Sequence, residues 1–372
     1  MNPQPLFCAN PACTSRGEQN AGNIVVHVSL EERFRCRTCG HTFAATQGTV
    51  FHRLKTDKKT VETVLTLLAL GCPPQAIVAA FGLDERTLKS WQKKAGEHCQ
   101  RVHEALVQTP QDLQQVQADE IRVKLQARLV LWMAMAICVP TRLWLGGMVG
   151  AHRDKYFLRA LAQKVRACAA LRPLLLLTDG FGGYKQAWQQ AFRQPLHTGQ
   201  VGRPLLLPWP QVAFGQIIKW REAGRVLGIR VCSLGGAVSQ IRALVPPGQV
   251  LNTAYIERLN ATFRARLCCL CRRTRALARH QTTLTQGMYL VGCVYNFCTF
   301  HKSLRQKHRE GSRKWRERTP AMAAGLTDQR WSVGDLLAYR VAPPPFVPKK
   351  CGRRKPKSVD AQLKGAEARL TL

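Results

Sequence analysis

Carboxylate side chains are scarce in this sequence. Its 372 residues include 22 Asp and Glu against 56 Lys and Arg, which gives a formal net charge of +34. A charge of that size bears on partners rather than on fold. We therefore expect a polyanionic partner, with nucleic acid as the first candidate and an anionic membrane surface as the weaker alternative.

Long apolar runs and an export signal are also lacking. The longest runs, LVLWMAMAICV from Leu129 and PLLLLTD from Pro173, are too short to span a bilayer and are typical of buried strands. The first residues, MNPQPLFCANPAC, show no basic segment followed by an apolar one. We therefore expect a cytoplasmic, nucleoid-associated protein without membrane segments. Its 15 cysteines are then expected to bind metal or to be buried thiols rather than to form disulfides.

Four cysteines near the start have the spacing of a zinc site. Cys36 and Cys39 form a tight C-x2-C knuckle, and Cys8 and Cys13 form a wider pair before a strand-like stretch, GNIVVHVS. Two short-spaced pairs supply the four thiolates of a tetrahedral site. They predict a zinc ribbon over residues 1–52 that binds one structural Zn²⁺; buried free thiols are the alternative.

Residues 56–108 show the pattern of a helix-turn-helix domain. Apolar residues from Val61 to Leu68 mark one helix face, and Gly71 ends that helix. A short second helix ends near Gly82, and Asp84 is placed to cap a third. Such a third helix enters the major groove of DNA. Its predicted outward contacts are Arg86, Lys89, Ser90, Lys93 and Lys94. The alternative is a small helical bundle with a solvated basic face.

Because acids are so rare, each one from residue 113 to residue 309 can be questioned individually. The six acids of that span are Asp119, Glu120, Asp154, Asp179, Glu222 and Glu257.

The first two acids lie in QQVQADEIRVKLQ, where apolar residues alternate as in a strand. ARLVLWMAMAICV and TRLWLGGMVGA are expected to be two further strands of an antiparallel meander. Neighbouring side chains on a strand point to opposite faces, so we expect only one of Asp119 and Glu120 to serve a site, and we favour Asp119.

The next two acids flank regular elements. Asp154 precedes a helical pattern, KYFLRALAQKVRAC, which predicts an N-cap. The run from Leu174 to Leu177 is typical of a strand buried on both faces, and Asp179 follows its end. Ligands of α/β sheets gather at such carboxyl ends. Glu222 lies between basic residues in KWREAGR, where a surface ion pair is the simpler interpretation.

The last acid lies on a predicted helix in the stretch NTAYIERLNATFRARL, which Thr253 could cap. Glu257, Asn260 and Arg264 lie at i, i+3 and i+7, so they share one face of that helix. The arginines that follow exceed what solubility requires. We predict that Arg258, Arg266, Arg272 and Arg273 contact the DNA backbone.

Three strands, a helix, a strand with an aspartate at its tip and a late helix carrying a glutamate form the order of an RNase H-like domain. In that fold the carboxylates converge on two divalent cations, Mg²⁺ or Mn²⁺, which clamp the oxygens of a phosphodiester. We therefore expect a multidomain α/β protein whose catalytic domain spans residues 112–310, with a β-rich insertion at about 196–250. A C-terminal extension, 311–372, ends in a proline-rich basic tail expected to be partly disordered.

At this point the chain resembles transposases of the IS-one (insertion sequence one) family. The similarity lies in YIERLNATFRARL and the segment after it, in QADEIRV, LLTDGFGGY and FRCRTCGHTFAATQGTVFH, and in RTPAMAAGLTDQRWSVGDLL. It implies a DDE transposase in which Asp119, Asp179 and Glu257 hold the metals and Asn260 and Arg264 support them.

The resemblance also implies a pathway and partners. The zinc ribbon and the helix-turn-helix would bind the terminal inverted repeats of the element in double-stranded DNA. The enzyme would cleave at the 3′ end and join the freed hydroxyl to target DNA, as a homo-oligomer that brings two ends together. The alternatives are a non-catalytic DNA-binding regulator and an RNase H-like nuclease without strand transfer.

Overall fold

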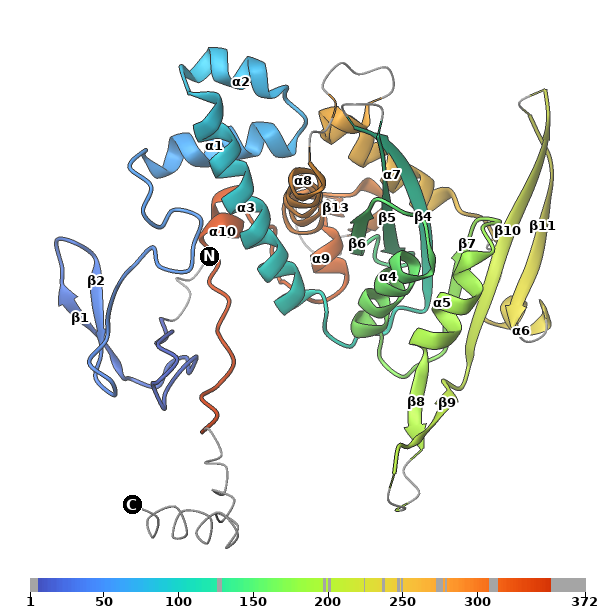
Figure 1. Cartoon of the computed structure of the whole chain (residues 1–372), viewed down its shortest axis with the longest axis horizontal. Helices are drawn as coiled ribbons and strands as arrows, with labels where there is room; N and C mark the ends of the chain where they lie inside the picture. The colour runs from blue at the N-terminus through green and yellow to red at the C-terminus, as the bar shows by residue number, and fades with distance from the viewer. Residues whose placement is uncertain are drawn as a thin grey trace, which may run out of the picture. The chain divides into compact units, whose positions relative to one another are not determined.

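The structure is a computed structural model (Figure 1). It describes residues 6–125, 129–196, 199, 202–223, 225–235, 238–245, 248, 250–271, 277, 280–307 and 314–348. These residues fall into two compact units, one of residues 6–43 and 342–348 and the other of residues 44–341. The predicted basic tail after residue 348 lies outside the described residues.

The smaller unit is built on a three-stranded sheet in the order β1-β2-β3. The strands are β1 (Ile24–Val28), β2 (Arg33–Cys36) and β3 (Thr42–Ala44). β1, which lies in the strand-like stretch GNIVVHVS, pairs with β2 in the antiparallel sense.

Three helices follow in the larger unit, with the boundaries that the sequence predicts. They are α1 (Lys58–Ala69), α2 (Pro74–Phe81) and α3 (Glu85–Leu106). Gly82 ends α2 in the left-handed conformation, at a φ of 60°. Asp84 caps α3, since its side chain accepts a hydrogen bond of 2.6 Å from the backbone N–H of Arg86. α3 is long, with 22 residues, because its second half is buried against the rest of the unit.

A six-stranded mixed sheet in the order β11-β10-β7-β4-β5-β6 lies at the centre of the larger unit (Figure 1). β4 (Gln115–Lys124), β5 (Val130–Cys138) and β6 (Trp144–Gly150) form the predicted antiparallel meander. β7 (Leu174–Thr178) is buried along its whole length and pairs in parallel with β4. The carboxyl ends of β4 and β7 therefore point the same way.

Helices cover both faces of this sheet. α4 (Lys155–Cys168) packs on β5 and β6, with α5 (Gly183–Ala191) beside it, and α7 (Ala254–Arg266) packs on β4 and β5. Gln117 contacts the start of α7, whereas Glu120 contacts Arg153 just before α4. Since residues 117 and 120 point to opposite faces of β4, α4 and α7 cover opposite faces.

The region expected to be an insertion is β-rich, but its longer strands extend the main sheet. β10 (Val212–Glu222) pairs in parallel with β7, and β11 (Arg225–Gly235) pairs with β10. β8 (Arg193–Leu196) and β9 (Leu205–Pro208) form a separate short hairpin, and α6 (Val238–Ala243) packs on β10 and β11. The sequence predicted a β-rich region here but not that β10 would pair with β7.

The C-terminal part of the larger unit completes its core. α8 (Gln281–Cys293) packs along α3 and continues as a π-helical turn (Val294–Cys298). A Cβ at Gly96 of α3 would lie only 2.5 Å from the Cβ of Gln286 in α8, so this crossing requires glycine. The remaining elements are 3₁₀ turns at Cys268–Leu270 and Lys302–Leu304, β12 (Gln306–Lys307), β13 (Trp315–Arg316), α9 (Pro320–Ala323) and α10 (Val333–Ala338).

α10 packs against α1 and α3, and Leu336 and Leu337 belong to the same hydrophobic core as the sheet. Residues 314–341 of the predicted extension are therefore part of the larger unit.

Candidate functional site

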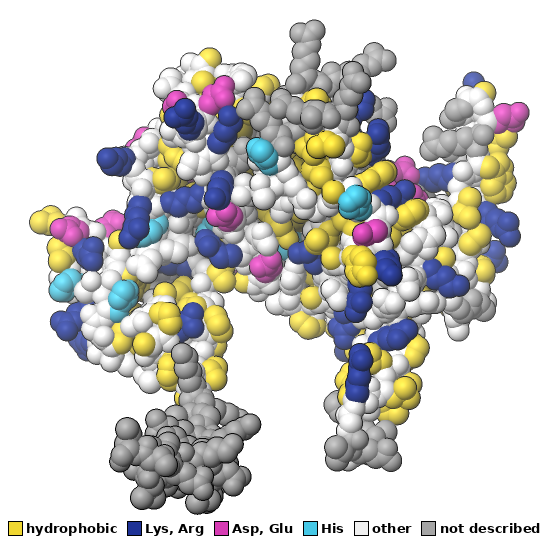
Figure 2. All heavy atoms as spheres, in the orientation of Figure 1, with side chains coloured by type: hydrophobic (Ala, Val, Ile, Leu, Met, Phe, Trp, Pro, Cys, Tyr) yellow, Lys and Arg dark blue, Asp and Glu magenta, His cyan; other side chains and the backbone are white. Residues whose placement is uncertain are grey.

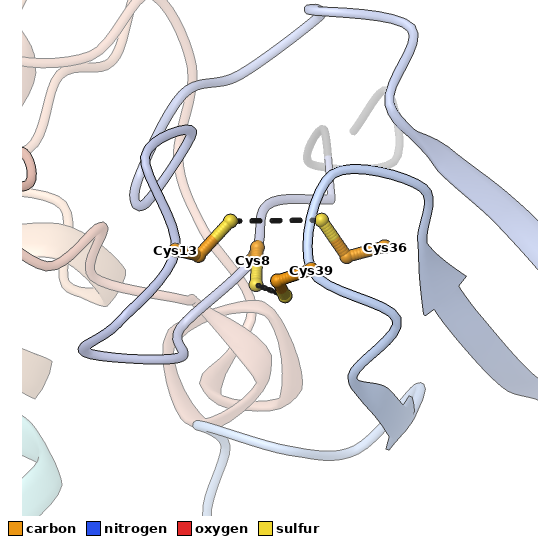
Figure 3. Close-up of side chains that lie close together, drawn as sticks. All are labelled: Cys8, Cys13, Cys36 and Cys39. Carbon is orange, nitrogen blue, oxygen red and sulfur yellow. Dashed lines mark hydrogen bonds between the residues drawn. The ribbon is translucent and has the colours of Figure 1, made fainter.

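Two loops of the smaller unit bring the four predicted zinc ligands together (Figure 3). The Sγ atoms of Cys8 and Cys39 are 3.6 Å apart, and those of Cys13 and Cys36 are 3.8 Å apart. All four sulfur atoms lie within 4.8 Å of one another. Gly40, at a φ of 73°, closes the second knuckle by donating its N–H to the carbonyl of Cys36. The group could hold a zinc ion.

The surroundings of these thiols differ in polarity. Burial raises the pKa of Cys8, because little around it solvates a thiolate. Burial also acts to raise the pKa of Cys39, but hydrogen bonds from the His41 backbone and the Asn10 side chain outweigh it and lower that pKa to about 7. A bound cation would favour the thiolate form of all four side chains.

A cluster of carboxylates lies in the larger unit where the pairing of β4 with β7 ends, in the middle of β4 and just past the carboxyl end of β7. Ala118 pairs with Thr178, so Asp119 and Asp179 are the next residues on two adjacent parallel strands. Oxygens of Asp119, Glu120 and Asp179 all lie within 4.8 Å of one another. Asp119 and Asp179 are predicted metal ligands, and Glu120 is the neighbour that was weighed against Asp119 for that role.

Glu120 is held by a buried ion pair. Its Oε2 accepts a hydrogen bond of 2.7 Å from Arg153 Nη2, which also lies 3.9 Å from Asp179 Oδ2. The Arg153 guanidinium stacks over the Phe181 ring, 3.5 Å from its centroid. Burial raises the pKa of Glu120 against the hydrogen bond and charge of Arg153. Glu120 therefore already has a cationic partner within the protein.

Asp119 instead faces α7. Its Oδ2 accepts a hydrogen bond of 2.8 Å from Asn260 Nδ2, and its Oδ1 accepts one of 2.8 Å from the backbone N–H of Glu120. Burial is the main reason that the pKa of Asp119 rises to about 7, and the carboxylates of Asp179, Glu120 and Glu257 act in the same direction. The ionised form of Asp119 is thus unfavourable without a nearby cation.

Glu257 lies one helical turn before Asn260 and outside the three-carboxylate cluster. Its Oε1 accepts a hydrogen bond of 2.5 Å from Lys219 Nζ and one of 2.8 Å from Thr253 Oγ1. Thr253 is the N-cap residue, as predicted, but its hydroxyl bonds to Glu257 rather than to the helix backbone.

The start of α7 is bound to the sheet by Gln117. Its Oε1 accepts hydrogen bonds from the backbone N–H groups of Tyr255 (3.1 Å) and Ile256 (3.0 Å), and its Nε2 donates to the carbonyl of Asn252. Gln117 and Asp119 share one face of β4, so one strand both caps the helix and presents the carboxylate. In the described part of the chain, the Arg264 side chain has no recorded bond to these carboxylates, and its supporting role stays a prediction.

The predicted DNA contacts of α3 fall into two groups. Arg86, Lys89, Ser90 and Lys93 are exposed, and Lys89 forms an ion pair of 3.0 Å with Glu85. Lys94 is half-buried and donates to the backbone carbonyl of His52, so it does not point outward as expected.

A groove of about 860 Å³ runs beside the exposed residues of α3. Arg86, Lys89, Ser90 and Lys93 line one side of it, and Arg266 and His280 line the other. Arg258 is exposed on α7, while Arg272 and Arg273 lie outside the described residues. On the face of the molecule shown in Figure 2, lysine and arginine side chains outnumber acidic ones among the described residues.

Sequence reasoning missed Arg153, Lys219 and Gln117. Gln117 could have been found, because it precedes Asp119 by two residues on an alternating strand and must point to the same face. No comparable signal marks Arg153 or Lys219 among the 56 lysines and arginines.

Within the described residues, no helix combines the length and the apolar character that crossing a membrane would require. A comparison of the whole chain with protein-family models and with curated proteins finds no match.

Proposed function

We propose that this protein is a DDE-type DNA transposase with an RNase H-like catalytic domain. It would bind the terminal inverted repeats of an insertion sequence, cleave at the 3′ ends and transfer the freed ends into target DNA. The observation that carries the proposal is the convergence of Asp119, in the middle of β4, with Asp179, just past the end of the parallel strand β7, beside the helix that bears Asn260 and Glu257.

The strand order supports the fold assignment. Three antiparallel strands are followed by a helix, a parallel strand that ends at Asp179 and a late helix that carries Glu257. This is the order expected for an RNase H-like domain. The extra strand β11 adds to the outer edge of the sheet, beside β10.

The surroundings of the two neighbouring acids favour Asp119 over Glu120 as the ligand. Glu120 is paired with Arg153, and replacing that contact would leave a half-buried guanidinium without its closest partner. Asp119 has no cationic side chain bound to it among the described residues, because its partner Asn260 is a neutral amide. We therefore propose that Asp119 and Asp179 are the carboxylates that bind the cation.

The donor atoms fit Mg²⁺ or Mn²⁺. Carboxylate oxygens are the ligands these cations prefer, and oxygens within 4.8 Å of one another can share one ion. Asp119 and Asp179 would hold the cations, with Glu257 as a third ligand. When bound, the cations would supply the positive charge that activates the attacking hydroxyl and stabilises the leaving oxygen. Asn260 would keep Asp119 oriented, and Arg258 would contact the DNA backbone.

DNA binding would also involve the smaller unit and the first helices. The four cysteines would hold Zn²⁺ and fix the two loops that carry them, a structural role because no ligand position remains open. In the helix-turn-helix interpretation, α3 would read DNA through Arg86, Lys89, Ser90 and Lys93.

The test is an end-cleavage and joining assay. The full-length protein is incubated with Mn²⁺ and with a labelled duplex that carries one end of the sequence flanking the gene. We expect the wild type to release the 3′ end and to join it to a target plasmid, and Asp179→Asn and Glu257→Gln to do neither.

Glu222→Gln is the matched control, because Glu222 is exposed at the end of β10 and outside the carboxylate cluster. Equal cleavage by the wild type and Glu257→Gln would refute the metal-site assignment. Cleavage without joining would favour a nuclease, and binding without cleavage would favour a regulator.

A further inference from the structure

Lys219 and Glu257 form a closed hydrogen-bonded triangle with Thr253. Lys219 Nζ lies 2.5 Å from Glu257 Oε1 and 3.0 Å from Thr253 Oγ1, and the hydroxyl of Thr253 lies 2.8 Å from the same carboxylate oxygen. The Lys219 side chain is only 19% exposed, whereas that of Glu257 is 51% exposed. The lysine is therefore the fixed member of the pair, and the glutamate is the one with room to move.

The triangle keeps Glu257 out of the carboxylate cluster although its helix is already in place. Asn260, one turn further along α7, is hydrogen-bonded to Asp119, and Gln117 holds the first turn. With the helix held in this way, a change of side-chain rotamer is the movement by which Glu257 would turn toward the cluster. The ammonium of Lys219 opposes that change.

We propose that Lys219 is a positioning residue that holds Glu257 away from Asp119 and Asp179 until a phosphodiester of bound DNA takes over its ammonium group. The proposal rests on the proposed function, because it assumes that Asp119 and Asp179 bind a divalent cation. It adds that Glu257, the third ligand, would bind the cation only when substrate DNA is present.

The location of Lys219 suits contact with a phosphate. β7 pairs with β10 only as far as Gln216, and β10 continues with β11 alone beyond that point. Lys219 lies in this extension, at the end of the sheet where Asp179 lies. A lysine ammonium is a point charge that binds a phosphate oxygen as readily as a carboxylate. An incoming phosphodiester would therefore compete directly with Glu257.

The first measurement is Mn²⁺ affinity without DNA, by electron paramagnetic resonance. Lys219→Met should bind Mn²⁺ about tenfold more tightly than the wild type, because a competing positive charge is removed beside a ligand. Lys219→Arg, which preserves the ion pair, should resemble the wild type. Arg230→Met is the matched control: it removes a charge from the same hairpin, at a position paired with Ile218 on the opposite face.

A second comparison separates positioning from simple charge removal. In a Glu257→Gln background, Lys219→Met should no longer tighten Mn²⁺ binding, because there is no carboxylate to release. A gain that persists in that background, or an equal gain in Arg230→Met, would overturn the proposal. Circular dichroism checks the fold, and Lys219→Gln, which can still bond to Thr253, replaces Lys219→Met if that variant unfolds.

The proposed exchange of Glu257 for a DNA phosphate at the Lys219 ammonium can be measured separately. For a labelled duplex of arbitrary sequence, the slope of log affinity against log salt should fall by about one in Lys219→Met, because one phosphate contact is lost. An unchanged slope would refute the proposed contact between Lys219 and a DNA phosphate. If Asp119→Asn and Asp179→Asn leave Mn²⁺ binding intact, the proposed metal centre itself fails. If they abolish it while Lys219→Met has no effect, only the present inference fails.

Discussion

Replacing Asp119 by Asn should make the stability of the larger unit less dependent on pH. In the folded, cation-free protein the pKa of Asp119 rises from its ordinary value of 3.8 to about 7. Between these values the folded state holds a proton that the unfolded state has released. Wild-type stability should therefore decrease as pH rises through this window and level off above about pH 7. An amide at this position carries no charge at any of these pH values.

The magnitude follows from the pKa change. A tenfold change in proton affinity corresponds to about 1.4 kcal/mol, so the change from 3.8 to about 7 sets an upper value of about 4 kcal/mol. Asp119 is only partly buried, and solvent screening should reduce this to about 2 kcal/mol. Roughly half of that loss falls between about pH 5 and about pH 8, which predicts about 1 kcal/mol of change there.

The assay is urea unfolding followed by tryptophan fluorescence, in buffer without divalent cations. All 8 tryptophans lie in the larger unit, so the signal reports on that unit alone. The free energy of unfolding of Asp119→Asn, relative to the wild type, should rise by about 1 kcal/mol from about pH 5 to about pH 8. A difference that does not change with pH, or that changes in the opposite sense, would show that burial and neighbouring carboxylates do not act on Asp119 as described.

Three further predictions concern other parts of the molecule. Cys36→Ser should abolish zinc binding, measured by elemental analysis, and leave the tryptophan-detected melting temperature unchanged; retained zinc would contradict the four-thiolate site. Arg153→Met should cost about 3–5 kcal/mol in urea unfolding because it leaves Glu120 buried without its partner, and adding Glu120→Gln should recover most of the loss; no recovery would mean that the arginine acts by packing. Gly96→Leu should cost about 2 kcal/mol or more because α3 touches α8 there, whereas Gly182→Ala, with open space around it, should be nearly neutral, and equal costs would argue against that close contact.

Features that depend on neighbours in sequence could be predicted. The N-caps at Asp84 and Asp154 and the end of the second helix near Gly82 follow from local hydrogen bonding and backbone freedom, and all three are confirmed. The buried run at β7 and the strands before it were also predicted correctly, although β4 is buried along most of its length and not on one face alone.

The pairing of β10 with β7 could not be predicted. Strand partners are chosen by long-range packing, and the apolar residues of β10 fit the main sheet as well as they would fit a separate hairpin. The same limit applies to Lys94, whose inward bond depends on how the loop at His52 lies against α3.

The candidate site likewise has features that the sequence predicted and features that only the tertiary structure decided. The scarcity of acids left only six candidates from residue 113 to residue 309, and strand and helix patterns together with the family resemblance favoured Asp119, Asp179 and Glu257 among them. Which cation each carboxylate contacts was decided only by the tertiary structure. Arg153 reaches Glu120 and Lys219 reaches Glu257 because strand order and helix packing bring them there, and nothing in the local sequence distinguishes these two cations from the others.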